Sequence, residues 1–325
     1  MPDLPPLIST ADLAARLGEP DLRLVDASWH LDGRDGRPDH ETARLPGAVF
    51  FDLEASSDPD SDLPHMLPSP EAFGARMGDL GLRETDHIVV YDTVGIRSSA
   101  RVWWMFRVMG APRVQVLDGG LPKWRVEGRP IESGPAAAPV PTVFDAHLDS
   151  AAVADIEAVR AALAGEAQVI DARAAERFAG RAPEPRAGLR AGHMPGALNL
   201  PFPTLLNPDG TMKSAGELEA AFRAAGLDPH RPVVTSCGSG VTAAILSLGL
   251  AALGRPSRVY DGSWAGMGQS RRHAGGAIDQ PAANRTASSL RPRASAVSCS
   301  TTAPTKPRSS ASAAKWRLGT KVGDP

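Results

Sequence analysis

Short β-branched apolar runs alternate with longer apolar or amphipathic stretches along most of the chain. The run 233–236 predicts a buried strand, and the Ala- and Leu-rich stretch that continues to Leu253 predicts a helix that stops at Gly254. The stretches 10–17 and 156–163 also predict helices. Strands that alternate with helices are typical of an α/β fold, in which helices flank a parallel sheet.

Four short landmarks occur twice in the same order, about 145 positions apart. The pairs are Leu24–Ala27 with Val169–Ala172, Leu45–Ala48 with Met194–Ala197, Ile88–Asp92 with Pro232–Cys237, and Val116–Gly120 with Val259–Ser263. A near-constant offset indicates a duplicated domain. We therefore predict α/β domains at 1–133 and 151–265, a linker at 134–150 that is rich in Ala and Pro, and a disordered C-terminal tail at 266–325.

Cys237 follows the strand predicted at 233–236 and lies between glycine-spaced positions that lead into a helix. Backbone N–H groups of such a loop and the positive end of the helix favour the thiolate, which is the nucleophilic form. A buried, inert cysteine is the alternative. The equivalent position in the first repeat is Asp92, so we expect the first domain to be catalytically silent, and its apolar stretch 101–106 to pack in the core and between the domains.

The totals exclude several classes of protein. A chain of 325 residues can bury two cores, and a net charge of −2 with a pI near 6.5 offers no attraction to nucleic acid or an anionic membrane. Two cysteines cannot build a disulfide framework. The N-terminus lacks the pattern of a signal peptide, and no apolar run reaches membrane-spanning length. We expect a cytoplasmic protein without a nucleic-acid or membrane partner.

The paired LPGA/MPGA and DGG/DGSW signatures and the loop Cys-Gly-Ser-Gly-Val-Thr resemble the tandem-domain rhodanese superfamily, and within it the 3-mercaptopyruvate sulfurtransferase family. The resemblance covers about residues 8–265. It implies that sulfur moves from 3-mercaptopyruvate to Cys237 as a persulfide, that pyruvate is released, and that the sulfur passes to cyanide or to a thiol acceptor such as a thioredoxin-like protein. No metal and no other cofactor is implied.

The same resemblance implies a substrate-binding set. Two arginines nine residues apart match Arg177 and Arg186, and an arginine fork can hold a carboxylate with two hydrogen bonds. The loop around the cysteine adds Gly238, Gly240, Val241 and Thr242. From the residues alone, the alternative is surface arginines paired with Glu176 and Glu184. Arg181 matches no position that the family requires.

A proton relay is also implied by the family. Ser239 lies two residues after the cysteine, and the matching first-domain stretches place His65 and Glu54 beside it. Mammalian members of the family carry Asp where this chain has Glu54. A single histidine in a loop is otherwise a solvated surface group. His193 is interpreted as a residue that structures a turn.

Three other functions stay open at this point. The first is a thiosulfate:cyanide sulfurtransferase. Rhodaneses that use thiosulfate carry cationic residues just after the cysteine, where this chain has Gly238 and Ser239. A thiol phosphatase needs Cys-x5-Arg, and the sixth residue after Cys237 is Ala243. A non-enzymatic sulfur carrier is the third alternative.

The chain departs from the family pattern after Trp264. Codons compatible with 266–276, read with one base fewer, restore Glu-Trp-Gly and continue as Ser-Pro-Gly-Asp-Met-Pro-Val. We therefore expect a one-base frameshift near codon 266 and an out-of-frame tail in which Cys299 has no catalytic part. A natural basic tail is the alternative, and resequencing the gene across this codon decides between them.

Overall fold

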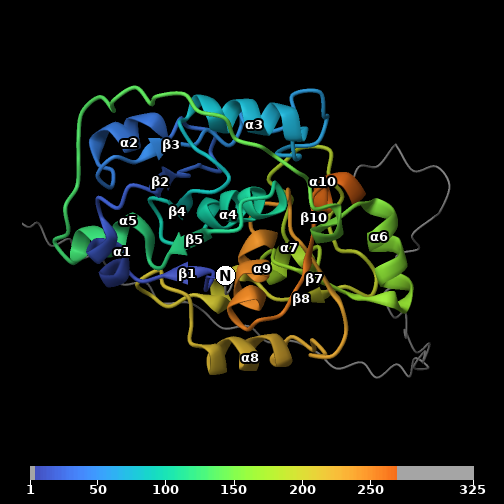
Figure 1. Cartoon of the computed structure of the whole chain (residues 1–325). Helices are drawn as coiled ribbons and strands as arrows, with labels where there is room; N and C mark the ends of the chain where they lie inside the picture. The colour runs from blue at the N-terminus through green and yellow to red at the C-terminus, as the bar shows by residue number, and fades with distance from the viewer. Residues whose placement is uncertain (1–3, 269–325) are drawn as a thin grey trace, which may run out of the picture. The chain divides into compact units, whose positions relative to one another are not determined.

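The computed structural model describes residues 4–268 and contains two five-stranded sheets in which all strands are parallel (Figure 1). The first sheet has the order β1-β5-β4-β2-β3. Its strands are β1 (Leu7–Ile8), β2 (Leu22–Asp26), β3 (Val49–Phe50), β4 (His87–Tyr91) and β5 (Val114–Leu117). The accompanying helices are α1 (Thr10–Arg16), α2 (Arg37–Thr42), α3 (Pro70–Asp79), α4 (Ser98–Val108) and α5 (Gly120–Val126).

The second sheet repeats this topology with the order β6-β10-β9-β7-β8. Its strands are β6 (Val153–Ala154), β7 (Gln168–Asp171), β8 (Leu198–Asn199), β9 (Val233–Ser236) and β10 (Arg258–Tyr260). The α-helices are α6 (Ile156–Ala161), α7 (Ala175–Phe178), α8 (Ala215–Ala224), α9 (Ala243–Ala252) and α10 (Ser263–Met267). Short 3-10 turns, η1 (Ser150–Ala152) and η3 (Phe202–Leu205), and a π-helical turn, η2 (Ala162–Glu166), complete the domain. The predicted fold class, two tandem α/β domains with helix-flanked parallel sheets, is confirmed.

Local sequence explains where several elements begin and end. Ser69 caps α3 by accepting the N–H of Ala72, and Pro70 occupies the first turn, where a missing N–H is harmless. Ser214 and Glu217 form a reciprocal capping box at the start of α8. Helix α9 ends where Gly254 adopts a left-handed φ of 68°. Strands β4 and β9 are buried at every position, as expected for parallel strands covered on both faces.

One hydrophobic cluster spans both domains, and each domain has a second buried cluster of its own. Helix α4 of the first domain packs against α9 of the second (Figure 1). Trp103 and Trp104 are 6% and 4% exposed and belong to the same buried cluster as Ile245 and Leu246 of α9. The apolar stretch 101–106 therefore packs in the core and between the domains. Loops at the carboxyl ends of the two sheets can contact one another because this core holds the domains together.

The second domain differs from expectation at two places. The helix predicted at 156–163 is α-helical only to Ala161 and continues as the π-helical turn η2, in which Gly165 has a non-helical φ of 117°. Helix α10 continues to Met267, two residues past the boundary expected at residue 265. The rest of the predicted tail, including Cys299, lies outside the described residues. Among residues 4–268, no helix is long and apolar enough to cross a membrane.

Candidate active site at Cys237

Cys237 directly follows β9 at the carboxyl end of the second sheet and is 2% exposed. The loop of residues 238–242 then leads into α9, whose cap residue is Thr242. Gly240 has φ 80°, which a residue with a side chain rarely adopts, so this position requires glycine. A Cβ there would also lie 2.9 Å from Nη1 of Arg101 and from the carbonyl oxygen of Asp261. The glycine therefore lets the loop lie close against both residues.

The hydroxyl of Ser263 holds this loop in place. The N–H groups of Cys237 and Gly240 donate to Ser263 Oγ at 3.1 and 3.0 Å, and that oxygen lies 3.8 Å from Cys237 Sγ. Ser263 adopts φ 46°, whereas the first repeat has Gly120 there, with φ 56°. A serine in a glycine conformation indicates that the hydroxyl is needed. The sequence reasoning assigned Ser263 no part in the site, although the aligned DGG and DGSW signatures contained this signal.

The first repeat indicates what the loop backbone can do with a negative charge. The Asp92 carboxylate accepts N–H donors from Val94, Arg97 and Ser99. The positions matched to these donors by the repeat lie in the segment 239–244 that follows Cys237. The duplicated strand–loop–helix unit thus surrounds an anion at the strand end in the first domain. The same architecture in the second domain is suited to a thiolate.

His65 of the first domain contacts the cysteine loop of the second domain. Its ring Nδ1 lies 3.2 Å from Ser239 Oγ, and Nε2 lies 2.9 Å from Glu54 Oε1. Trp29 Nε1 donates to the same Glu54 oxygen at 2.8 Å, and the indole meets the imidazole edge-on, with ring centroids 4.9 Å apart. His65 is 3% exposed, so it is not a solvated surface group. The structure brings together the three residues of the predicted relay and adds Trp29, which the sequence reasoning missed.

The surroundings of His65 and Glu54 lower the pKa values of both side chains. Burial lowers the pKa of His65 below its ordinary value, and the cations Arg186 and Arg101 act in the same direction while Glu54 opposes them. Burial acts to raise the pKa of Glu54, but the hydrogen bond from Trp29 and the interaction with His65 outweigh it, so that pKa is lowered. At neutral pH the ring is therefore neutral and the carboxyl is ionised. With that charge state, Nε2–H donates to Glu54 and Nδ1 accepts from the Ser239 hydroxyl.

The two predicted binding arginines have different surroundings. Arg177 pairs with Glu184 through Nη2, and a Cβ on Gly238 would lie 3.1 Å from that nitrogen. Arg186 is half-buried and forms no hydrogen bond or ion pair with any described residue. Burial lowers its pKa, although the charges of Cys237 and Glu54 partly offset that effect. Arg186 is thus an unpaired cation within electrostatic reach of the cysteine.

The neighbouring charges are engaged elsewhere. Glu184 also accepts from Arg173, which is fully buried, binds Asp171 and lies over the Trp264 ring. Arg181 forms an exposed pair with Glu176. Pairing with a glutamate, the alternative role for these arginines, is therefore found for Arg181 and, with a shared glutamate, for Arg177. His193 stacks on Phe178 and lies apart from the cysteine loop contacts.

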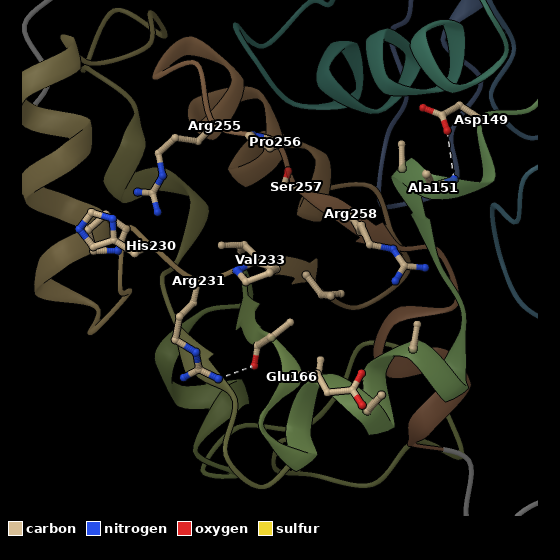
Figure 2. A pocket seen from close by; sticks show the side chains of 18 of the residues that line it. Asp149, Ala151, Glu166, His230, Arg231, Val233, Arg255, Pro256, Ser257 and Arg258 are labelled. Carbon is tan, nitrogen blue, oxygen red and sulfur yellow. Dashed lines mark hydrogen bonds between the residues drawn. The ribbon is translucent and has the colours of Figure 1, made fainter.

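A cavity of about 710 Å³ lies away from this chemistry (Figure 2). Its walls include Val233 at the start of β9 and Arg258 at the start of β10. It therefore opens at the amino ends of the strands, whereas Cys237 follows a carboxyl end. Its guanidinium groups donate to backbone carbonyls, as Arg231 does to Ala167. Within residues 4–268, no group of three or more His, Cys, Asp or Glu side chains could hold a metal ion.

Comparison with known proteins places this geometry in a family. The rhodanese-like domain family matches residues 9–127 and 155–269. Human 3-mercaptopyruvate sulfurtransferase is 43% identical over 79% of this chain and 88% of its own length, and rat thiosulfate sulfurtransferase is 42% identical over 80% and 90%. The crystal structure of SseA, a 3-mercaptopyruvate sulfotransferase of Escherichia coli, superposes with a TM-score of 0.74 at 39% identity, covering 80% of this chain and 99% of that one. The chain belongs to the rhodanese family and contains two rhodanese-like domains in tandem.

Proposed function

We propose that this protein is a 3-mercaptopyruvate sulfurtransferase that works through a persulfide on Cys237 and releases pyruvate. The single observation that supports this most strongly is the hydrogen-bonded chain Glu54–His65–Ser239, which ends two residues from the cysteine. A donor that leaves as a carbanion equivalent needs proton transfer, and this chain of groups is suited to it. The similarity to relatives named for 3-mercaptopyruvate supports the same donor.

The proposed transfer balances in protons and electrons. The Cys237 thiolate attacks the donor sulfur, the new S–S bond forms as the C–S bond breaks, and the C–S electron pair passes into the enolate of pyruvate. The proton that the donor thiol loses passes through Ser239 to the neutral His65 ring, and Glu54 stabilises the resulting imidazolium. The same proton returns through Ser239 to the enolate. The persulfide sulfur then leaves on attack by cyanide or by a thiol, which regenerates the Cys237 thiolate.

Binding of the donor carboxylate is assigned to Arg186, with Arg177 beside it. Among residues 4–268, no carboxylate forms a hydrogen bond or ion pair with Arg186, so its donors are free to form a charge-assisted fork. Arg177 shares its charge with Glu184 but stands against Gly238 of the cysteine loop. We assign the loop positions Gly238, Gly240, Val241 and Thr242 to enclosing the transferred sulfur.

The choice of donor is tested by running pyruvate release from 3-mercaptopyruvate beside thiocyanate formation from thiosulfate and cyanide. We expect 3-mercaptopyruvate to give the higher kcat/KM, because Gly238 and Ser239 provide no side-chain cation for a thiosulfate dianion. A higher kcat/KM with thiosulfate would establish the alternative enzyme. Turnover of neither donor would favour a non-enzymatic sulfur carrier. A phosphatase is disfavoured because Ala243 occupies the position of the phosphate-binding arginine.

We further propose a thiol acceptor, such as a thioredoxin-like protein, and a cytoplasmic location. Both rest on the sequence interpretation, and one relative is named as mitochondrial. Transfer of labelled sulfur from loaded protein to candidate dithiol proteins measures the acceptor directly.

Replacement of Arg186 by alanine is expected to raise KM for 3-mercaptopyruvate by about 10- to 100-fold, because a charge-assisted hydrogen bond to the donor carboxylate is lost. Arg186→Lys should recover little, because a point charge replaces the planar fork. Arg177→Ala should have a smaller effect, since Glu184 already neutralises much of that charge. The matched control is Arg181→Ala on the same loop, which removes an exposed pair only. Equal behaviour of the Arg186 and Arg181 variants would exclude a binding role for Arg186.

The pH dependence should report the His65 ring. The lowered pKa leaves the ring neutral at pH 7, and only the neutral ring can accept the donor proton. Activity should therefore be lost as pH falls through a value below 6.5, by about tenfold per pH unit in kcat/KM. The His65→Gln variant should show a lower rate without this acid limb. An acid limb of the same position in that variant would assign the titration to another group.

A further inference from the structure

One ion pair between the two domains contacts the backbone of His65, the central residue of the proposed relay. Arg101 of α4 is fully buried, and its Nη2 lies 2.6 Å from Asp261 Oδ1, at the end of β10. The same nitrogen donates to the backbone carbonyl of His65. The guanidinium also lies over the ring of Trp104, at 4.5 Å from the centroid. This pair is separate from the hydrogen bonds that the His65 ring forms with Ser239 and Glu54.

The pair holds the backbone around His65 from both sides. His65 has φ 60°, the left-handed conformation that is strained for a residue with a side chain. Arg101 binds the carbonyl of His65, and Asp261 Oδ2 accepts the N–H of Leu67 at 2.7 Å. A strained backbone persists only where its surroundings determine it strongly. The ion pair is therefore part of what keeps the His65 ring within 3.2 Å of Ser239 Oγ.

The same pair also touches the cysteine loop. A Cβ on Gly240 would lie 2.9 Å from Arg101 Nη1 and 3.5 Å from Asp261 Oδ1, so the loop packs directly on these two side chains. Asp261 is followed after one residue by Ser263, whose hydroxyl binds the N–H groups of Cys237 and Gly240. One buried pair thus contacts the loop that presents the proton relay and the loop that presents the nucleophile.

We propose that Arg101 and Asp261 are positioning residues that set His65 relative to Ser239 and the Cys237 loop, so that the first domain directs the proton-transfer step. The proposal rests on the proposed function. Both side chains are buried, so they act through the residues that they contact. Their effect passes through His65 and is confined to formation of the persulfide, because discharge of the sulfur to cyanide needs no proton from the relay.

Stability alone cannot test this idea. Removing one member of a buried pair leaves an uncompensated charge and destabilises the fold, whatever the pair does for catalysis. Replacing both with uncharged side chains of similar volume is often tolerated. The suitable variant is therefore the double replacement Arg101→Met with Asp261→Asn. The single variant Arg101→Lys, which keeps the charge but not the planar fork, provides a second probe if the double variant does not fold.

The experiment is a double-mutant cycle on kcat for pyruvate release, with the replacement of the pair and His65→Gln as its two changes. In the parent background, replacement of the pair should lower kcat by about 10- to 100-fold, as expected for a misplaced proton donor, and Arg101→Lys should produce a smaller loss. In the His65→Gln background, neither change should lower kcat by more than about twofold, because the group they position is gone. Discharge of preloaded persulfide to cyanide should stay within about threefold of the parent rate.

Losses that multiply with that of His65→Gln would overturn the proposal, as would an equal loss in persulfide discharge. An unchanged kcat in the folded pair variant would overturn it as well. Failure of the proposed function is distinguishable from these outcomes, because in that case the parent protein itself would release no pyruvate from 3-mercaptopyruvate. The thermal midpoint of each variant identifies those that are folded and therefore enter the cycle.

Discussion

Replacement of Cys237 by serine is expected to lower pyruvate release from 3-mercaptopyruvate by at least about 10³-fold, because a serine hydroxyl is not ionised near neutral pH and cannot replace a thiolate nucleophile. Cys237 is buried, and serine is nearly isosteric with cysteine, so the thermal midpoint should change little. Mass spectrometry of the parent after incubation with donor should find one added sulfur on the peptide that contains Cys237. The serine variant should show none.

Cys299→Ser is the matched control for this prediction. It removes the second cysteine of the chain, in the segment that follows the domains, and should leave both turnover and the persulfide on Cys237 intact. Substantial pyruvate release by Cys237→Ser would contradict the assignment of the nucleophile. Added sulfur on the Cys299 peptide in place of the Cys237 peptide would do the same.

The second large effect is expected at the relay. Ser239→Ala and His65→Gln should each lower kcat with 3-mercaptopyruvate by about 10²- to 10³-fold, within the range of general acid–base catalysis. The two groups are hydrogen-bonded and pass the same proton, so the double variant should be no slower than the slower single variant. Single-turnover measurement of pyruvate release separates this step from the discharge of the persulfide.

His193→Gln is the matched control for the histidine. His193 stacks on Phe178 and its Nδ1–H donates to the backbone carbonyl of that residue, so its replacement leaves the relay intact. Turnover of this variant should stay near that of the parent. If His193→Gln and His65→Gln lower kcat equally, or if the Ser239 and His65 effects multiply, the relay is not the path of the proton.

The sequence by itself determined the fold class and the place of Cys237, the proposed nucleophile. The repeated landmarks required two similar domains, and both sheets have the same strand order. The buried run before Cys237 and the glycine-spaced loop after it required a strand, a tight loop and a helix, since apolar periodicity and glycine placement are local properties. The offset of the repeat also matched Cys237 to Asp92, which places the proposed nucleophile in the second domain.

The residues around the nucleophile were harder to predict from local pattern. His65 and Glu54 came from a family resemblance, because nothing in the stretch around them indicates that they are buried against Ser239. Ser263 and Trp29 were missed for different reasons. Ser263 acts through a backbone conformation that the sequence matched to a glycine, and Trp29 lies in the loop after β2, 25 positions before Glu54.

The tertiary structure decided which charges are free and which are paired. From the sequence, Arg177, Arg181 and Arg186 are three arginines on one loop. Only packing shows that Arg181 pairs with Glu176, that Arg177 shares Glu184 with a buried arginine, and that Arg186 has no acidic partner among the described residues. It also decided that Arg101 meets Asp261 across 160 positions of chain. The Arg101–Asp261 pair joins the two domains, so it depends on the docking of α4 against α9, which brings together segments that lie far apart in the sequence.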